Sequence, residues 1–565
     1  MPSELDLKLD AIMDGLTAPG GMMTLTTYED HGVTLPMIAT APPALSYYFA
    51  HFCAQHGDKD FLVCNDERLS FTQVYEQARA VAGALVQGFG VQRGDHIGIA
   101  ARNAPGWIVL YMGILIAGGV ATLLNGWWTG PELADGIDES DTKLVFADPP
   151  RAKRLAETRH SAEVVVVDVG LPIAQAMAPV LARGGAETEL PMLSGDDIAT
   201  ILFTSGSTGQ SKGAISTHRA VVQGTFNYLA QTLMTLQLAT EMGMAPTLQP
   251  CTLLNVPLFH VTAEVPVMLQ SFAMGRKLVI MQKWDAEEAM RLMEREKVTY
   301  FVGVPLMSFE ILTHPNRKDY DLSSVMDFAA GGAPRPVEHV KRIDEEMGGA
   351  KPLIGYGLTE TNGVGCGNFR DNYLAKPNST GRGSRPLVDL AILDDAGRPV
   401  PQGERGEVCI RSICNFTEYY KNPDATKAAF TDDRYFRTGD IGYLDEDGYL
   451  FIVDRKKDII IRGGENISCQ EVEAAIYEST DVAEAAVFGL PDERFGEVPG
   501  AVVHPADGAT LTAEDLQAFL QPRLAGFKIP ARIWVSPEPL PRLGTEKIDK
   551  VSLRNRYREL VQQGG

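Results

Sequence analysis

One short stretch of the sequence combines glycines, hydroxyl side chains and a lysine in an order suited to binding a polyphosphate. Its residues are Thr204, Ser205, Gly206, Ser207, Thr208, Gly209 and Lys212. Glycines let the backbone turn several N–H groups toward one point, and hydroxyl and ammonium groups there also favour negative charge. The alternative is a glycine–serine surface loop, which the strand-like apolar run at 198–203 just before it disfavours. The spacing differs from the common P-loop, because Ser211 stands where that motif requires its second glycine.

Two later segments present surfaces that suit a planar base. The first is the turn Gly332, Ala333 and Pro334. It follows a predicted strand at 327–330, and a glycine turn can press its backbone flat against a ring. The second is Tyr356, whose aromatic face could stack on the same ring, although a core tyrosine is the alternative. Adenine is the base that we expect at this position.

Three residues are candidates for contacts with phosphate and with a metal ion. The Thr359 hydroxyl could donate a hydrogen bond to an α-phosphate. The Glu360 carboxylate could bind Mg²⁺, a hard cation that prefers oxygen ligands, and the Thr204 hydroxyl is the second expected ligand. For Glu360 the alternative is an exposed surface acid.

Three further residues carry groups that could contact a sugar or a carboxylate. Asp440 follows a glycine and could accept hydrogen bonds from both ribose hydroxyls, with a turn-capping aspartate as the alternative. Arg455 could meet the same ribose, although a solvated charge is the default for an arginine in a charged run. His260 lies in the apolar segment 255–261 and could contact a carboxylate substrate, with a satisfied core histidine as the alternative.

Taken together, these segments resemble the adenylate-forming superfamily of acyl-CoA synthetases, luciferases and peptide-synthetase adenylation domains. The matching motifs occur in the family's order and spacing over roughly residues 45–555. They begin at the glycine-rich stretch and end at a tail segment at 541–550. The turn at 462–467 is similar to the acyl-CoA synthetase branch in particular.

The resemblance implies an ATP-dependent acid–thiol ligase. A carboxylic acid would attack ATP in the presence of Mg²⁺ to give acyl-AMP and pyrophosphate, and the thiol of coenzyme A would then displace AMP. Lys547 falls on the lysine that stabilises the first transition state. Gly464 falls on a glycine lining the tunnel for the pantetheine arm of CoA, and Lys457 on the hinge of a mobile C-terminal domain. The implied catalytic residues are Lys547, His260, Thr359 and Glu360.

The sequence departs from the family pattern in two places. Family members usually have glycine before the tail lysine, whereas this chain has Glu546, which could pair with Lys547 or stiffen the loop. Where amino-acid-activating members carry an aspartate for the α-amine, the region around His260 is apolar, which favours a lipophilic acid such as a fatty acid. The alternatives are an adenylate-forming enzyme with another acceptor, a luciferase-like oxygenase, and a nucleotide-binding pseudoenzyme silenced by Glu546.

Continuous apolar strands alternate with helical stretches through the first part of the chain. Such strands are predicted at 96–100, 144–147 and 164–167. Their lack of polar alternation indicates a parallel sheet covered on both faces. The stretch 106–128 imitates a membrane span, but its glycines favour a buried helix followed by a short strand at 120–124. Residues 1–40 are predicted to be loop-rich.

The residue pattern of the sequence changes after about residue 380. Short strands separated by Gly and Asp turns predict a β-barrel-like subdomain, and a charged run at 454–458 then precedes an α+β unit. A chain of 565 residues also exceeds what one hydrophobic core supports. We therefore expect an α/β fold: a multi-sheet N-terminal domain with βαβ layers at 1–453, a hinge linker at 454–458 and a small mobile α+β C-terminal domain at 459–565.

The overall composition limits the partners and the compartment. A formal net charge of -22 argues against direct nucleic-acid binding, and 45% hydrophobic residues are ordinary for a globular protein. Seven dispersed cysteines without a C-x-x-C pair indicate a reduced, cytoplasmic protein with neither a zinc site nor a disulfide framework. The first residues show no signal-peptide pattern. No transmembrane segment is expected, while peripheral membrane contact and a homodimer stay open.

Overall fold

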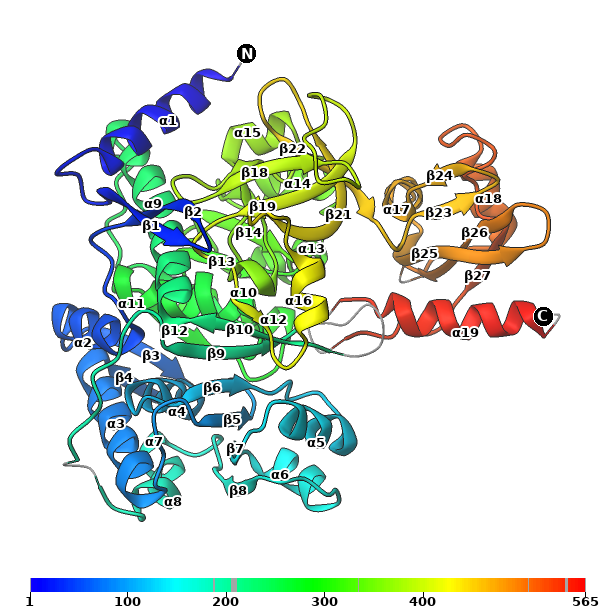
Figure 1. The fold of residues 1–565 in the computed structure, drawn as a ribbon. Helices are drawn as coiled ribbons and strands as arrows, with labels where there is room; N and C mark the ends of the chain where they lie inside the picture. Colours follow the sequence, from blue (N-terminus) through cyan, green and yellow to red (C-terminus); the bar gives the residue numbers. More distant parts are fainter. Residues whose placement is uncertain are drawn as a thin grey trace. The chain divides into compact units, whose positions relative to one another are not determined.

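The computed structural model describes residues 2–185, 188–204, 211–333, 335–506, 508–543 and 547–563. The chain divides into two compact units. Among the described residues, unit 1 holds the chain up to Leu390 together with Ile410–Phe436. Unit 2 holds Ala391–Cys409 together with the chain from Arg437 onward. Figure 1 shows the helices and strands of both units in sequence colours.

A seven-stranded sheet of unit 1 is built mainly from the apolar strands predicted from the sequence. Its order is β20-β10-β9-β6-β5-β7-β8. The strands are β5 (His96–Ala100), β6 (Val120–Leu123), β7 (Leu144–Ala147), β8 (Glu163–Val166), β9 (Ile198–Phe203), β10 (Gly213–Thr217) and β20 (Glu418–Tyr419). β9, β6, β5, β7 and β8 run parallel, whereas β10 pairs antiparallel with β9 and with β20. Burial of β6 and β7 along their whole length explains why they lack polar alternation.

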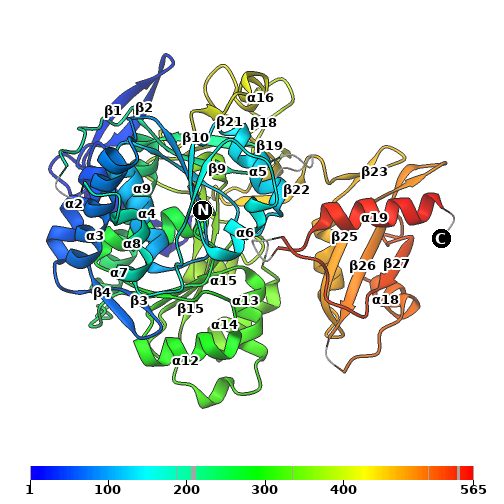
Figure 2. The ribbon, with the colours of Figure 1, turned by 90° about the horizontal axis from the view of Figure 1, so that it is seen from below.

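A nine-stranded sheet forms the second layer of unit 1, in the order β17-β16-β15-β14-β13-β11-β12-β3-β4. The strands are β3 (Asp60–Cys64), β4 (Glu67–Ser70), β11 (Cys251–Leu254), β12 (Lys277–Ile280), β13 (Tyr300–Gly303), β14 (Asp327–Gly331), β15 (Lys351–Tyr356), β16 (Cys366–Phe369) and β17 (Arg382–Gly383). The parallel strands are β3, β12, β11, β13, β14 and β15. At the two edges of the sheet, β4, β16 and β17 pair antiparallel. Helices α12 (Ala286–Glu296), α13 (Pro305–Thr313) and α14 (Val337–Glu346) lie together beside this sheet in both views (Figures 1 and 2).

Helix α4 (Pro105–Ile116) accounts for the first half of the stretch that resembles a membrane span. All 12 of its residues are buried, so its apolar surface contacts protein on every side, and β6 follows as predicted. Within the described ranges, no helix is both long and apolar enough to cross a membrane. The other helices of unit 1 include α2 (Leu45–His56), α3 (Phe71–Gly83), α5 (Gly130–Glu139), α6 (Pro149–Ala156), α7 (Ile173–Ala176), α8 (Ala178–Leu181), α9 (His218–Glu241), α10 (Val261–Ala263), α11 (Gln270–Met274), α15 (Arg370–Ala375) and α16 (Pro423–Ala429).

The N-terminal segment corrects the sequence prediction, because it is not loop-rich. It forms helix α1 (Glu4–Thr17) and an antiparallel hairpin of β1 (Leu25–Asp30) and β2 (Val33–Ile38). Ser3 and Asp6 form a capping box, in which each side chain accepts a hydrogen bond from the other residue's backbone N–H. The cap satisfies N–H groups that a helix start would otherwise leave unpaired.

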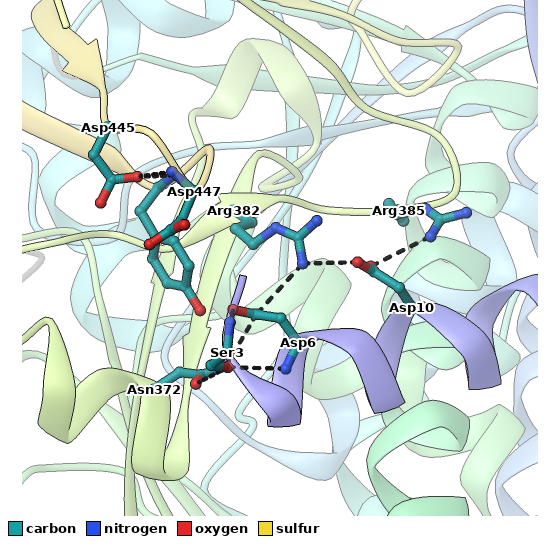
Figure 3. A network of polar contacts seen from close by, with 9 residues as sticks. Ser3, Asp6, Asp10, Asn372, Arg382, Arg385, Asp445 and Asp447 are labelled. Atoms are coloured by element: carbon teal, nitrogen blue, oxygen red, sulfur yellow. Dashed lines mark hydrogen bonds and ion pairs between the residues drawn. The ribbon is translucent and has the colours of Figure 1, made fainter. Parts of the chain in front are cut away.

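Acidic side chains of α1 hold an edge of the nine-stranded sheet (Figure 3). Arg382 Nη1 lies 3.4 Å from Asp6 Oδ1 and 3.0 Å from Asp10 Oδ2. Asn372 Nδ2 also donates to Asp6 Oδ1 at 3.0 Å. Asp6 is only 3% exposed, so its carboxylate depends on these partners. The helix therefore ties the start of the chain to β17 and α15, about 370 residues further along.

Unit 2 contains the C-terminal α+β fold that the sequence predicts. A five-stranded sheet has the order β24-β23-β26-β25, with β27 paired to β26. Its strands are β23 (Ile460–Arg462), β24 (Glu465–Ile467), β25 (Val482–Asp492), β26 (Gly496–Pro505) and β27 (Arg532–Val535), and its helices are α17 (Cys469–Ile476), α18 (Ala513–Leu520) and α19 (Lys550–Gln562). The short strands expected after residue 380 form a four-stranded sheet, β18 (Asp389–Leu393), β19 (Gly406–Arg411), β21 (Phe436–Leu444) and β22 (Leu450–Arg455).

Candidate active site

The two ends of the predicted phosphate loop lie on an antiparallel hairpin. β9 and β10 pair with Phe203 opposite Gly213. The backbone N–H of Thr204 donates to Lys212 O at 2.9 Å, and that of Lys212 to Thr204 Oγ1 at 3.4 Å. A strand follows the loop, whereas a helix follows a P-loop, so the two differ in structure as well as in spacing. The remaining predicted residues, Ser205, Gly206, Ser207, Thr208 and Gly209, lie outside the described part of the chain.

Lys212 and Glu360, which are far apart in the sequence, meet around Tyr419. Lys212 Nζ lies 4.8 Å from the centroid of the Tyr419 ring, and Tyr419 Oη donates to Glu360 Oε1 at 2.7 Å. Burial raises the pKa of the Tyr419 phenol, and the Glu360 carboxylate acts in the same direction, so the phenol remains a hydrogen-bond donor. The sequence prediction missed Tyr419, because β20 joins β10 only in the folded sheet.

Three predicted site segments follow the carboxyl ends of parallel strands in the nine-stranded sheet. His260 follows β11, the turn of Gly332 and Ala333 follows β14, and Tyr356 ends β15. Gly332 has φ 78°, in the left-handed region that favours glycine. Pro334 lies outside the described residues. Ligands of α/β proteins commonly bind in the crevice at this edge of a sheet.

The backbone around Thr359 and Glu360 is closely packed. Both residues lie in a short 3-10 turn, Thr359–Thr361, directly after the end of β15. A Cβ at Gly357 would lie 1.9 Å from Gly363 O, so no larger residue fits there. Tyr228 Oη donates to the same carbonyl at 2.5 Å. This packing fixes where the predicted phosphate and metal ligands can point.

His260 is the N-cap of helix α10, and its neighbours along the chain are buried apolar residues. Its Nδ1 accepts a hydrogen bond from the backbone N–H of Thr262 at 3.2 Å. The preceding segment is held by Asn103, which donates to Val256 O at 2.8 Å and accepts from the Leu258 N–H at 2.9 Å. His260 itself is half-buried. The buried apolar neighbours are Val256, Leu258, Phe259 and Val261.

In unit 2 the predicted ribose carboxylate lies close to the tail lysine. Asp440 and Arg455 are opposite each other in β21 and β22, and Arg455 Nε lies 3.3 Å from Asp440 Oδ1. Burial, and after it the charge of Arg455, lower the pKa of Lys547 to about 8 against the opposing charge of Asp440. The three predicted residues are therefore within electrostatic range of one another. Glu546 lies outside the described residues.

The turn assigned to the CoA tunnel requires glycine for its backbone. Gly463 and Gly464 join β23 to β24, with φ of 60° and 92°. A side chain at Gly464 would be strained in this conformation whatever space surrounds it. Lys457 lies in the turn between β22 and β23, and its hinge role stays a prediction.

Comparison with known proteins places the chain in a family. AMP-binding enzymes match residues 49–420, and the C-terminal domain of AMP-binding enzymes matches residues 471–547. The chain belongs to the AMP-binding enzyme family. This AMP-binding enzyme is 32% identical to feruloyl-CoA synthase of Amycolatopsis sp over 86% of the chain and 94% of that relative. It is also 32% identical to the long-chain-fatty-acid–CoA ligase FadD13 of Mycobacterium tuberculosis, over 88% and 94%.

Solved structures agree with the family and confirm the predicted fold class. ATP-bound MatB from Rhodopseudomonas palustris is similar with a TM-score of 0.80 and 28% identity, over 91% of this chain and 99% of that one. O-succinylbenzoate CoA synthetase from Bacillus subtilis, in complex with ATP and magnesium, gives a TM-score of 0.76 and 25% identity over 92% and 99%. The AMP-binding enzyme described here is an AMP-forming acid–CoA ligase that uses ATP, Mg²⁺ and CoA.

The side chains around Tyr419 fit a nucleotide phosphate with its ion. Lys212 supplies positive charge, and Glu360 supplies a carboxylate oxygen. In the described residues no group of three His, Cys, Asp or Glu side chains could enclose a metal ion. Mg²⁺ does not need such a group of three side chains. Beside phosphates it binds one or two carboxylates and completes its coordination shell with phosphate oxygens and water.

Proposed function

We propose that this AMP-binding enzyme activates a lipophilic carboxylic acid, either a fatty acid or an acid with an apolar ring, and transfers the acyl group to CoA. The observation that carries the proposal is the cluster of Lys212, Tyr419 and Glu360 at the base of the phosphate hairpin. The buried apolar residues around His260 support a lipophilic acid. The two relatives, named as a feruloyl-CoA synthase and a long-chain-fatty-acid–CoA ligase, also support a lipophilic acid.

The chemistry has two steps at one site. A carboxylate oxygen attacks the α-phosphorus of ATP, a new O–P bond forms, and the bond to the pyrophosphate oxygen breaks. The thiolate of CoA then attacks the acyl carbon, and the bond to AMP breaks. Both steps gather negative charge in the transition state, so fixed cations and donors lower the barrier. Bound Mg²⁺ supplies charge neutralisation at the phosphates.

Each predicted residue has a role in this scheme. Lys212 and the loop at 204–210 bind the phosphates, Thr359 donates to the α-phosphate, and Glu360 holds the ion. The turn of Gly332, Ala333 and Pro334 and the ring of Tyr356 bind adenine. Asp440 and Arg455 bind the ribose, and His260 contacts the carboxylate. Lys547 stabilises the first transition state, Gly464 borders the pantetheine arm, and Lys457 is the hinge.

A panel of carboxylic acids tests the proposal. Purified enzyme is incubated with ATP, Mg²⁺ and fatty acids of graded length, cinnamic-type acids, short dicarboxylic acids and amino acids, with and without CoA. We expect AMP and pyrophosphate with lipophilic acids, and acyl-CoA only when CoA is present. Preference for a dicarboxylic or amino acid would overturn the substrate class. Light emission or oxygen uptake without CoA would favour the luciferase-like alternative. Absence of AMP formation with every acid would favour the pseudoenzyme.

A further inference from the structure

The segment that carries Lys547 is closed into a narrow hairpin at its base. The backbone N–H of Leu543 donates to Lys547 O at 2.7 Å, and that of Asp549 donates to Pro541 O at 2.7 Å. Arg542 and Ile548 form an antiparallel bridge between these two bonds. The two arms therefore move together, and whatever holds them sets the position of Lys547.

A buried carboxylate of β25 holds the first arm. Glu484 Oε2 accepts the backbone N–H of Leu540 at 2.6 Å, and Glu484 Oε1 pairs with the Arg542 guanidinium. The Glu484 side chain is only 6% exposed. Both of its oxygens are thus used by residues at the start of the Lys547 hairpin. Desolvating such a group is costly unless its partners stay in place.

A second ion pair holds the other arm. Lys550, the first residue of α19, lies with its Nζ 2.6 Å from Glu473 Oε1, on helix α17. Glu473 also accepts the backbone N–H of Val487 at 2.7 Å, so this carboxylate is itself fixed to β25. Burial raises the pKa of Glu473, while the charge of Lys550 opposes that shift. Both anchors thus end on β25, the longest strand of the C-terminal sheet.

We propose that Glu484 with Arg542, and Glu473 with Lys550, are positioning pairs that fix the Lys547 hairpin on β25 and so set the geometry of the adenylation step. This inference rests on the proposed role of Lys547. None of the four side chains needs to contact substrate. Partly buried ion pairs such as these stabilise a fold little more than apolar residues of similar volume would, whereas their hydrogen bonds fix the directions of the side chains. Misplacing a catalytic group by about 1 Å can cost about a hundredfold in rate.

Glu484→Gln is the sharpest variant because it keeps the side-chain shape. A glutamine has one acceptor oxygen, so its NH₂ group must face either the Leu540 N–H or the Arg542 guanidinium, both of which are donors. One contact at the base of the hairpin becomes repulsive. Arg542→Lys and Arg542→Met form a second series, in which lysine keeps the charge and methionine removes it. Glu478→Gln is the matched control, since Glu478 forms an exposed ion pair with Arg523 elsewhere in unit 2.

The test measures the two half-reactions separately in the full-length enzyme, together with the melting temperature. Adenylation is followed by acid-dependent pyrophosphate release, and thioester formation by conversion of supplied acyl-AMP with CoA. We expect Glu484→Gln to slow adenylation by about 10- to 100-fold and to change thioester formation by less than about twofold. Arg542→Lys should retain more adenylation than Arg542→Met, and Glu478→Gln should behave as wild type.

Two results would overturn the inference. One is an equal loss of both half-reactions in Glu484→Gln and in Arg542→Met, which would mean a general structural role. The other is unchanged adenylation in a folded Glu484→Gln enzyme. Lys547→Ala, measured in parallel, distinguishes a failure of the proposed role of Lys547 from a failure of the positioning inference. If Lys547→Ala keeps adenylation, the proposed role of Lys547 is wrong. If only the anchor variants keep it, the positioning inference alone is wrong.

Discussion

The charge on Lys547 is set by its neighbours as well as by its own chemistry. Burial and Arg455 lower the pKa of Lys547 to about 8, whereas Asp440 opposes them. The ammonium form is the one that stabilises a developing anion. It is present below this pKa and is lost as pH rises through it. We therefore predict that the adenylation rate falls above about pH 8.

The fall of the adenylation rate at high pH, which is the alkaline limb of the pH profile, should shift when the surroundings of Lys547 change. Arg455→Gln removes a repulsive positive charge, so the pKa of Lys547 and the limb should move to higher pH, by about half a unit or more. The pH profile of pyrophosphate release is measured for wild type and variant at saturating ATP, since Arg455 is also a proposed ribose contact. A limb that moves to lower pH, or that persists unchanged in Lys547→Ala, would contradict the assignment of this titration to Lys547.

Glu264 is a buried acid for which the proposed reaction has no role. It is fully buried on the segment after α10, and Tyr111 Oη donates to its Oε1 at 2.7 Å. Burial raises its pKa from 4.5 to about 7, while the tyrosine hydrogen bond lowers it. Between these values the folded protein holds a proton that the unfolded chain has released. The free energy of unfolding therefore decreases as pH rises from about 4.5 to 7 and stays level above this window.

Glu264→Gln removes this titration and keeps an acceptor for Tyr111. We predict that the variant gains stability over wild type as pH rises from about 4.5 to 7, reaching about 3 kcal/mol above pH 7. Urea denaturation at several pH values measures the difference. A difference that is constant with pH would show that Glu264 does not change its ionisation in this range.

The candidate site shows what could be predicted at the residue scale. The lysine, acid and hydroxyl groups were predicted from the sequence, because each lies in a contiguous motif that contains glycine. Tyr419 could not be found in this way. Its importance comes from the antiparallel pairing of β20 with β10, which brings the phenol between Lys212 and Glu360. The Glu473 and Glu484 anchors could not be predicted either, because their partners Lys550 and Arg542 lie 77 and 58 residues further along the chain.

At the scale of elements, helix α1 is held by polar contacts as well as by its buried apolar residues Leu9, Ile12 and Met13. Asp6 completes the capping box and also accepts bonds from Asn372 and Arg382. We predict that Asp6→Ala destabilises unit 1 by about 1–3 kcal/mol, because it removes the acceptor of the Ser3 N–H in the capping box and an acceptor of the buried Asn372 amide. The exposed Asp14, which pairs with Arg385, is the control, and Asp14→Ala should cost less than about 1 kcal/mol. Thermal unfolding compares the two, and equal effects would contradict the account.

Apolar pattern predicted some elements well and others poorly. The fully buried α4 and the strands of the parallel sheets carry continuous apolar runs, so their prediction was correct. The prediction of a loop-rich start was wrong, because the buried residues Leu9, Ile12 and Met13 of α1 do recur at helical spacing and were not recognised as a helix. Helix α19 was not predicted, since most of its surface is polar and only residues such as Leu553 and Tyr557 pack inward. Polar anchoring leaves little trace in apolar periodicity.

At the scale of the whole molecule, the account requires two arrangements of the C-terminal domain. Adenylation needs Lys547 at the α-phosphate, and thioester formation needs the Gly464 turn near the pantetheine arm. Lys457 lies in the turn between β22 and β23, where a change of backbone angles would reorient everything that follows. Lys457→Pro fixes φ at this residue. It should therefore impair one half-reaction more than the other.

The most direct measurement is the rate of each half-reaction in Lys547→Ala and Lys457→Pro beside wild type. We predict that Lys547→Ala lowers acid-dependent pyrophosphate release by about 100-fold or more and still converts supplied acyl-AMP to acyl-CoA. Lys457→Pro should show the reverse pattern, with pyrophosphate release retained and thioester formation lost. Equal loss of both half-reactions in both variants, or full adenylation without Lys547, would contradict the central claim that one lysine and one hinge divide the reaction between two arrangements.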